Sequence, residues 1–143
     1  MTFRAMATHA AFATSAIAVA TMLIGAQAAS AATDDSFTVK TNGGCGSVEF
    51  VDYGPGAAGG GNNDDYAVIH DYCSDGKGVR AYAWIGSKYL GARNNTNGLN
   101  GSAVVWDPFG NVTNGQNVGL KVCLFNSDNV LSSCASANKT SDG

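Results

Sequence analysis

Methionine and histidine are scarce in this chain of 143 residues, and their absence from most of it restricts the chemistry. All three methionines lie within the first 22 residues, and His70 is the single histidine beyond residue 9. A histidine-rich metal site is therefore excluded from the main part of the chain. Any triad of the serine or cysteine protease type would have to use His70. The sequence also lacks a G-x-S-x-G nucleophile motif.

Charge is sparse as well. Charged residues make up 13% of the chain, and the formal net charge is −3. The basic residues are spread along the sequence, whereas nucleic acids and anionic membranes attract clustered basic residues. We therefore expect no nucleic-acid partner. No C-x-x-C pair occurs, so we expect no zinc site, and nothing in the sequence indicates another metal or a cofactor.

The N-terminal residues have the pattern of a secretory signal peptide. Arg4 precedes an apolar run from Ala10 to Ile24, and the small residues from Ala26 to Ala31 offer two A-x-A cleavage patterns. A run of about 15 apolar residues is shorter than the ~20 that span a bilayer. We predict that residues 1–31 are removed. The mature protein is then a single secreted, extracellular domain of residues 32–143 without a membrane span.

An extracellular location predicts that the four cysteines form two disulfides. Three pairings are possible for Cys45, Cys73, Cys123 and Cys134. Cys45 and Cys73 share an outward phase on their predicted strands. Pairing Cys45 with Cys73 and Cys123 with Cys134 closes two hairpin-sized segments, so this is the favoured connectivity.

Beyond residue 31 no apolar stripe has the period of a helix, and short apolar segments alternate with glycine- and asparagine-rich turns. This pattern predicts an all-β protein, a small antiparallel β-sandwich or barrel of about seven short strands, stapled by two disulfides. We predict a flexible loop at 54–63 and a frayed tail at 135–143. The expected strands are 36–40, 46–53, 65–73, 78–85, 102–107, 118–125 and 130–134.

Alternation along the strands predicts which side chains face the core. The alternate aliphatic residues from Val118 to Leu124 are expected to point inward. For the strand 78–85 either face can be the buried one. One face carries Arg80, Tyr82 and Trp84, and the other carries the smaller residues between them. The favoured prediction is that the two aromatic rings are buried in the core. On the outer face they would form a platform that stacks on sugar rings or docks a protein.

The candidate ligand-binding residues are therefore Arg80, Tyr82, Trp84 and Trp106. Trp106 lies where a predicted strand meets a turn, so it either anchors the turn or forms a rim of a binding surface, and the first role is commoner. His70 is expected to be a packed strand histidine, and no catalytic residue is assigned.

Acidic and amide side chains gather at 62–65, with Asp71 and Asp75 nearby in sequence. Such oxygens are the ligands that calcium prefers, but the spacing is not that of a known calcium loop. We expect solvated turn residues here and assign no metal.

Three segments, 73–84, 106–111 and 118–124, resemble small two-disulfide secreted proteins of actinobacteria, Streptomyces-like in character. The resemblance covers most of the predicted mature chain. It implies an exported all-β protein from such an organism. It implies no mechanism, because that group offers no assigned active residues to transfer.

These observations name no reaction or ligand. The leading hypothesis is a non-enzymatic extracellular binding module for a polysaccharide, the cell wall or another protein. A secreted enzyme inhibitor or toxin-like effector is the second, with 54–63 or 91–101 as the loop presented to a target. A small hydrolase that uses His70 is the third, and a structural surface component is the fourth.

Overall fold

The computed structural model describes residues 34–53 and 64–141, so the predicted signal peptide and the predicted flexible loop at 54–63 lie outside the described residues. The described residues contain eight strands and no helix. The strands are β1 (Phe37–Lys40), β2 (Gly46–Val51), β3 (Tyr66–Asp71), β4 (Gly78–Ile85), β5 (Lys88–Asn95), β6 (Val104–Trp106), β7 (Asn117–Phe125) and β8 (Leu131–Thr140).

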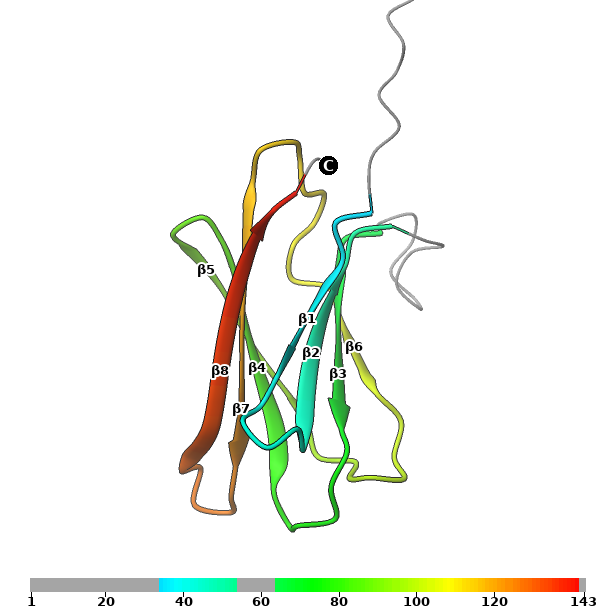
Figure 1. The fold of residues 1–143 in the computed structure, drawn as a ribbon, viewed down its shortest axis with the longest axis vertical. Coiled ribbons are helices and arrows are strands. Elements are labelled where there is room, and N and C mark those ends of the chain that lie inside the picture. The colour runs from blue at the N-terminus through cyan, green and yellow to red at the C-terminus, as the bar shows by residue number, and fades with distance from the viewer. Residues whose placement is uncertain (1–33, 54–63, 142–143) are drawn as a thin grey trace, which may run out of the picture. The chain divides into compact units, whose positions relative to one another are not determined.

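These strands form two antiparallel sheets (Figure 1). Sheet I has the order β1-β2-β3-β6, and sheet II has the order β5-β4-β7-β8. The chain builds the first three strands of sheet I, crosses to sheet II for the β4–β5 hairpin, returns as β6, and finishes with β7 and β8. The all-β prediction is confirmed, and all seven predicted strands are found.

One strand, β5, was missed by the sequence analysis. Ile85 pairs directly with Lys88, so only Gly86 and Ser87 form the hairpin turn, and Gly86 has a positive φ of 55°. Such two-residue turns favour glycine. The strand itself shows little alternation because it lies at the edge of sheet II and most of its side chains are exposed. Residues 91–95, predicted as part of a presented loop, belong to this strand.

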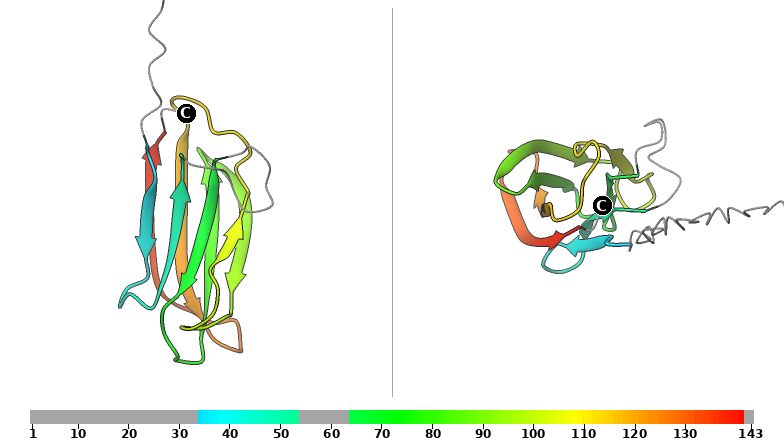
Figure 2. Two further views of the ribbon diagram at one scale, coloured as in Figure 1. Left: turned by 90° about the vertical axis from the view of Figure 1, so that its right-hand side faces the viewer. Right: turned by 90° about the horizontal axis from the view of Figure 1, so that it is seen from above.

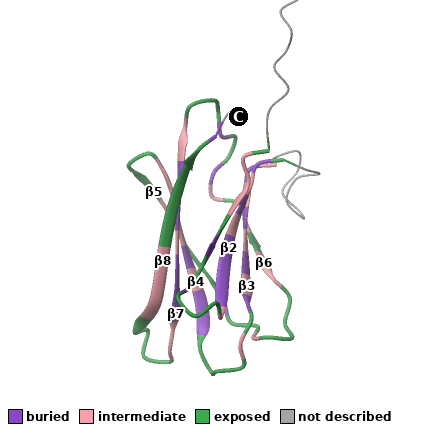
Figure 3. Cartoon of the chain, viewed as in Figure 1, coloured by how far each residue is buried: buried purple, intermediate pink, exposed green. Residues whose placement is uncertain are grey.

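The core lies between the two sheets (Figure 3). Val48, Phe50 and Ile69 from sheet I face small and aliphatic side chains of β4 and β7. Phe109, from the connection between β6 and β7, packs edge-on against Phe50 with ring centroids 5.1 Å apart. The predicted inward face of β7 is confirmed, because its aliphatic side chains are at most 4% exposed.

Both predicted disulfides are present. Cys45 pairs with Cys73, and Cys123 pairs with Cys134 across β7 and β8. The second bond lies at a β-bulge, where the register of β7 and β8 shifts between Val122 and Leu124. A bulge inserts an extra residue into one strand and turns it locally.

The two sheets meet along β1 and β8, which Figure 2 shows side by side. The Asn42 backbone N–H donates to the Ser133 carbonyl at 2.9 Å, and the Asn42 side chain donates to the Cys134 carbonyl at 3.0 Å. Ser133 has a positive φ of 52°, at the bulge. The bulge therefore directs two successive carbonyls of β8 toward sheet I.

The predicted frayed tail is wrong for residues 135–140, which form the second half of β8 and pair with β7 as far as Thr140. The segment lacks large apolar side chains, but its backbone joins the ladder of β7. The next residue, Ser141, is buried and donates its hydroxyl to Asp52 Oδ1 at 2.7 Å. Asp52 also accepts the Asp35 backbone N–H at 3.0 Å. One carboxylate thus joins the start of β1, the end of β2 and the end of β8.

A second carboxyl group, Asp65, is buried at the start of β3, with 3% of its surface exposed. Its Oδ2 accepts the Val112 backbone N–H at 2.6 Å and so fixes the connection between β6 and β7. Burial raises the pKa of Asp65 from 3.8 to about 6, although the hydrogen bond from Val112 acts in the opposite direction.

We expect Asp65 to make the free energy of unfolding of the wild-type protein decrease as the pH rises from about 4 to about 6.5. In this window the folded protein holds a proton on Asp65 that the unfolded chain has released. The Asp65→Asn variant stays neutral and keeps an oxygen for Val112. It should therefore be more stable than wild type at neutral pH by on the order of 1 kcal/mol.

Urea denaturation at about pH 4.5, near the lower end of the window of about 4 to 6.5, and at about pH 7.5, above it, measures this difference. Asp128→Asn, at an exposed turn residue, is the matched control. Equal pH dependence in Asp65→Asn and wild type would contradict the prediction.

Candidate functional site

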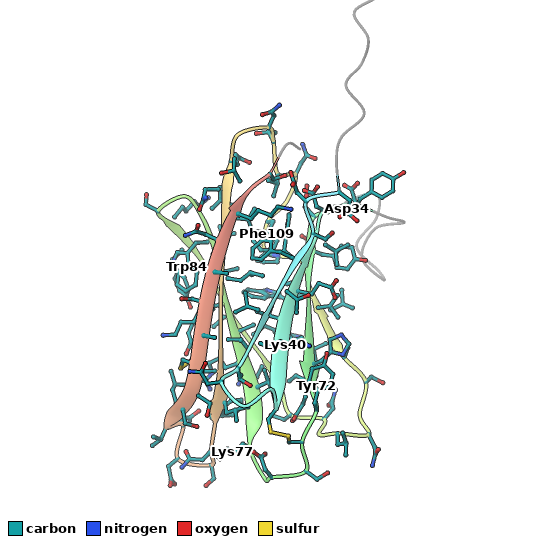
Figure 4. All side chains as sticks on the ribbon, in the orientation of Figure 1. Asp34, Lys40, Tyr72, Lys77, Trp84 and Phe109 are labelled. Carbon is teal, nitrogen blue, oxygen red and sulfur yellow. A yellow bond between two sulfur atoms is a disulfide. The ribbon has the colours of Figure 1, made fainter. Side chains whose placement is uncertain are left out.

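The site begins with the alternation of side chains along β4. Val79, Ala81 and Ala83 point into the core and are 0% exposed. The side chains between them, Arg80, Tyr82 and Trp84, therefore lie on the outer face of sheet II, where each is half-buried. Figure 4 shows Trp84 on the side of the sheet away from the core residue Phe109. The expected burial of Tyr82 and Trp84 in the core is wrong, because the small residues of β4 fill that role.

Three aromatic rings form a continuous strip on this outer face. Tyr82 and Trp84 have ring centroids 6.2 Å apart at an interplanar angle of 23°. Tyr89 of β5 pairs in register with Trp84, and their ring centroids are 5.3 Å apart. Tyr89 is 53% exposed. We call Tyr82, Trp84 and Tyr89 the aromatic strip.

Sequence reasoning missed Tyr89 because it missed β5. The usable signal was the two-residue spacing between Ile85 and Lys88, occupied by Gly86 and Ser87. A hairpin with that turn has only one register, and this register places Tyr89 opposite Trp84. The β-bulge lies beyond this pair, between Ala83 and Trp84.

A shallow groove of about 300 Å³ lies beside Trp84 on β7 and β8. Gly119 is the β7 partner of Trp84, and a Cβ atom at this position would lie 3.4 Å from the Trp84 Cβ. The missing side chain therefore leaves the β7 side of Trp84 open. Amide, hydroxyl and ammonium groups line the rest of the groove, from Asn117, Lys121, Ser136 and Asn138.

Two basic side chains accompany the rings. The Lys121 ammonium lies 5.5 Å from the centroid of the Tyr82 ring, and the Arg80 guanidinium lies 4.6 Å from that of Phe125. Contacts of this kind are attractive because the ring face carries negative charge. Gly78 makes room for the Phe125 ring, since a Cβ there would lie 2.7 Å from it.

Arg80 is held by neutral partners. Its Nε donates to Asn94 Oδ1 at 2.8 Å, and its Nη2 donates to Asn129 Oδ1 at 2.9 Å. Arg80 and Tyr82 line a second open groove of about 550 Å³ toward β5. The outer face of sheet II therefore combines apolar rings with amide, hydroxyl and cationic groups, a mixture suited to a ligand with apolar faces and polar edges.

Trp106 does not belong to this surface. It is the β6 partner of Ala67, whose side chain is 0% exposed, and it packs against the core. A Cβ atom at Gly91 of β5 would lie 3.7 Å from the Trp106 ring, so the indole lies under β5 rather than outside it. Of the four predicted binding residues, the structure brings together Arg80, Tyr82 and Trp84 and separates Trp106.

His70 lies on the outer face of sheet I, half-buried, with its ring stacked on Tyr72 at 5.4 Å. The residue paired with it in register, Ser47, is 1% exposed and shares a hydrogen bond with the Tyr72 hydroxyl. The sequence-based picture of a packed strand histidine agrees with this burial and stacking.

The acidic and amide residues at 62–65 were considered for calcium. Residues 62 and 63 lie outside the described residues, and Asp65 is buried and bonded to Val112. Within residues 34–53 and 64–141, no group of three or more His, Cys, Asp or Glu side chains is arranged to hold a metal ion.

Comparison with known protein families, curated proteins and solved structures found no match. In the described part of the chain, no helix is long and apolar enough to cross a membrane. Function must therefore be inferred from the geometry of this chain alone.

The two tryptophans should differ in their contribution to stability. Trp106→Ala removes a side chain that packs on the core, so we expect it to lower the free energy of unfolding by about 3 kcal/mol. Trp84→Ala removes a ring from the outer face, so we expect a loss of about 1 kcal/mol. Urea denaturation of both variants measures the difference. Equal losses, or a larger loss for Trp84→Ala, would show that this assignment of faces is wrong.

Proposed function

We propose that the protein is exported and acts as a non-enzymatic binding module that holds a polysaccharide on the outer face of sheet II. The aromatic strip is the observation that carries this proposal. Sugar rings have apolar faces of C–H groups and polar edges of hydroxyls. A row of aromatic rings on the outer face of a sheet, beside amide and hydroxyl groups, complements both parts of such a ligand.

The construction of sheet II supports a recognition role. The aromatic strip rests on the β4–β5 hairpin, and the groove beside Trp84 is formed by β7 and β8, which the Cys123–Cys134 disulfide joins. A face that is already ordered before binding loses little conformational freedom when a ligand arrives.

The predicted signal peptide and the two disulfides support export, since disulfides persist in oxidising compartments. An actinobacterial origin stays a prediction. No specific observation favours the inhibitor hypothesis over polysaccharide binding. Of its two loops, 54–63 lies outside the described residues and 91–101 begins within β5.

Co-sedimentation of the purified exported protein with insoluble cellulose, chitin and bacterial cell wall tests the proposal. We expect retention on at least one of them, and we expect Trp84→Ala to weaken it about tenfold, because one stacked ring contributes about 1.4 kcal/mol.

Tyr53→Ala is the matched control, since Tyr53 is 66% exposed and lies after β2 of sheet I, away from the aromatic strip. Urea denaturation of both variants must show that each is folded under the conditions of the assay. The proposal would be overturned if Tyr53→Ala and Trp84→Ala reduced retention equally. It would also be overturned if the wild-type protein were retained on none of the three materials.

A further inference from the structure

Charge is divided unevenly between the two sheets. The chain has an excess of acidic residues, yet the strands of sheet II contain no Asp or Glu. Every charged residue in those strands is basic. They are Arg80, Lys88, Arg93, Lys121 and Lys139.

Two of these basic residues, Arg80 and Lys121, lie among the rings of the outer face. Lys139, by contrast, forms an ion pair with Asp35 at 2.9 Å, toward the start of β1. The contacts of Arg80 and Lys121 are with neutral amides and aromatic rings, and neither forms an ion pair within the residues that the structure describes. Their positive charge is thus not neutralised by a described carboxylate of the protein.

The position of these charges is fixed by the fold. Arg80 is held from three sides by Asn94, Asn129 and Phe125, which gives the guanidinium a defined orientation before any ligand binds. Lys121 lines the groove beside Trp84 and lies over Tyr82. Tyr82 pairs with Lys121 in register, and Arg80 is two residues from Tyr82 on the same face. Cation and ring therefore alternate along the outer face.

We propose that the ligand is an acidic polysaccharide, whose sugar rings stack on the aromatic strip while carboxylates on those sugars pair with Arg80 and Lys121. This inference rests on the proposed function and adds the charge of the ligand to it. A guanidinium and an ammonium both bind carboxylates through charge-assisted hydrogen bonds, and a neutral polymer would leave both cations without such partners.

Single-stranded nucleic acids also bind to combinations of rings and cations. They require a basic groove that follows the phosphate backbone. Here Arg80 and Lys121 lie among the rings, and Arg93 lines the groove toward β5 together with Arg80. Amides and hydroxyls complete the groove beside Trp84. With so few cations, the arrangement favours an acidic sugar polymer over a nucleic acid.

Two pairs of soluble polymers test this inference: polygalacturonic acid and alginate, each compared with its esterified, neutral form. Affinity is measured by titration calorimetry in low salt. We expect the exported protein to bind at least one acidic polymer about tenfold more tightly than its neutral form, and salt should weaken this preference.

Lys121→Gln removes one cation without removing a ring. We expect it to weaken binding to the acidic polymer about threefold to tenfold and to weaken binding to the neutral form by a smaller factor. Lys40→Gln on β1 is the control for net charge, since Lys40 is exposed on sheet I (Figure 4). It should not alter either affinity.

Equal affinity for acidic and neutral forms, with binding lost in Trp84→Ala, would overturn the acidic ligand and leave polysaccharide binding intact. Failure to bind either acidic polymer would also overturn the acidic ligand. Retention on cellulose, chitin or cell wall tests the proposed function independently of this result. Tighter binding to single-stranded oligothymidylate than to both acidic polymers would overturn the acidic polysaccharide in favour of a nucleic-acid ligand.

Discussion

Alternation of side chains along β4 is the constraint on which the core and the candidate binding face both depend. β4 lies between β5 and β7, and its small inner residues let the side chains of sheet I approach closely. A slip of one residue would move Arg80, Tyr82 and Trp84 into the core and leave the alanines outside. The cost of burying a guanidinium there excludes that register. The packing that stabilises the fold therefore also exposes the rings.

The ends of the sandwich hold this face in place. At the bulge in β8, Cys134 forms a disulfide with Cys123, and the Ser133 and Cys134 carbonyls accept hydrogen bonds from Asn42 in the connection between β1 and β2. At the other end of β8, Asp52 accepts a hydrogen bond from the Ser141 hydroxyl. Because β7 and β8 form the groove beside Trp84, these contacts order a surface that has little apolar packing of its own. Neutral amides fix Arg80 in the same way without removing its charge.

Basic residues that are far apart in sequence become neighbours through antiparallel pairing. Arg80 and Lys121 look unrelated along the chain, and the sequence analysis accordingly found no basic cluster. Pairing of β4 with β7 brings Tyr82 beside Lys121, and pairing with β5 brings Trp84 beside Tyr89. Neither neighbour relation can be derived from periodicity, since each depends on which strands pair and in which register. The hairpin turn at Gly86 and Ser87 was the local signal for one of them.

The sequence by itself determined the all-β class, seven of the eight strands and the inward face of β7, and it favoured one of three cysteine pairings, which the structure confirms. Each follows from local alternation or from the short segments that the cysteines close. Only the tertiary structure decided that Tyr82 and Trp84 lie outside, that Trp106 packs inward under β5, and that β8 extends to Thr140. These outcomes depend on what the opposite sheet or the neighbouring strand offers each residue. A single strand does not contain that information, because either of its faces can be the buried one.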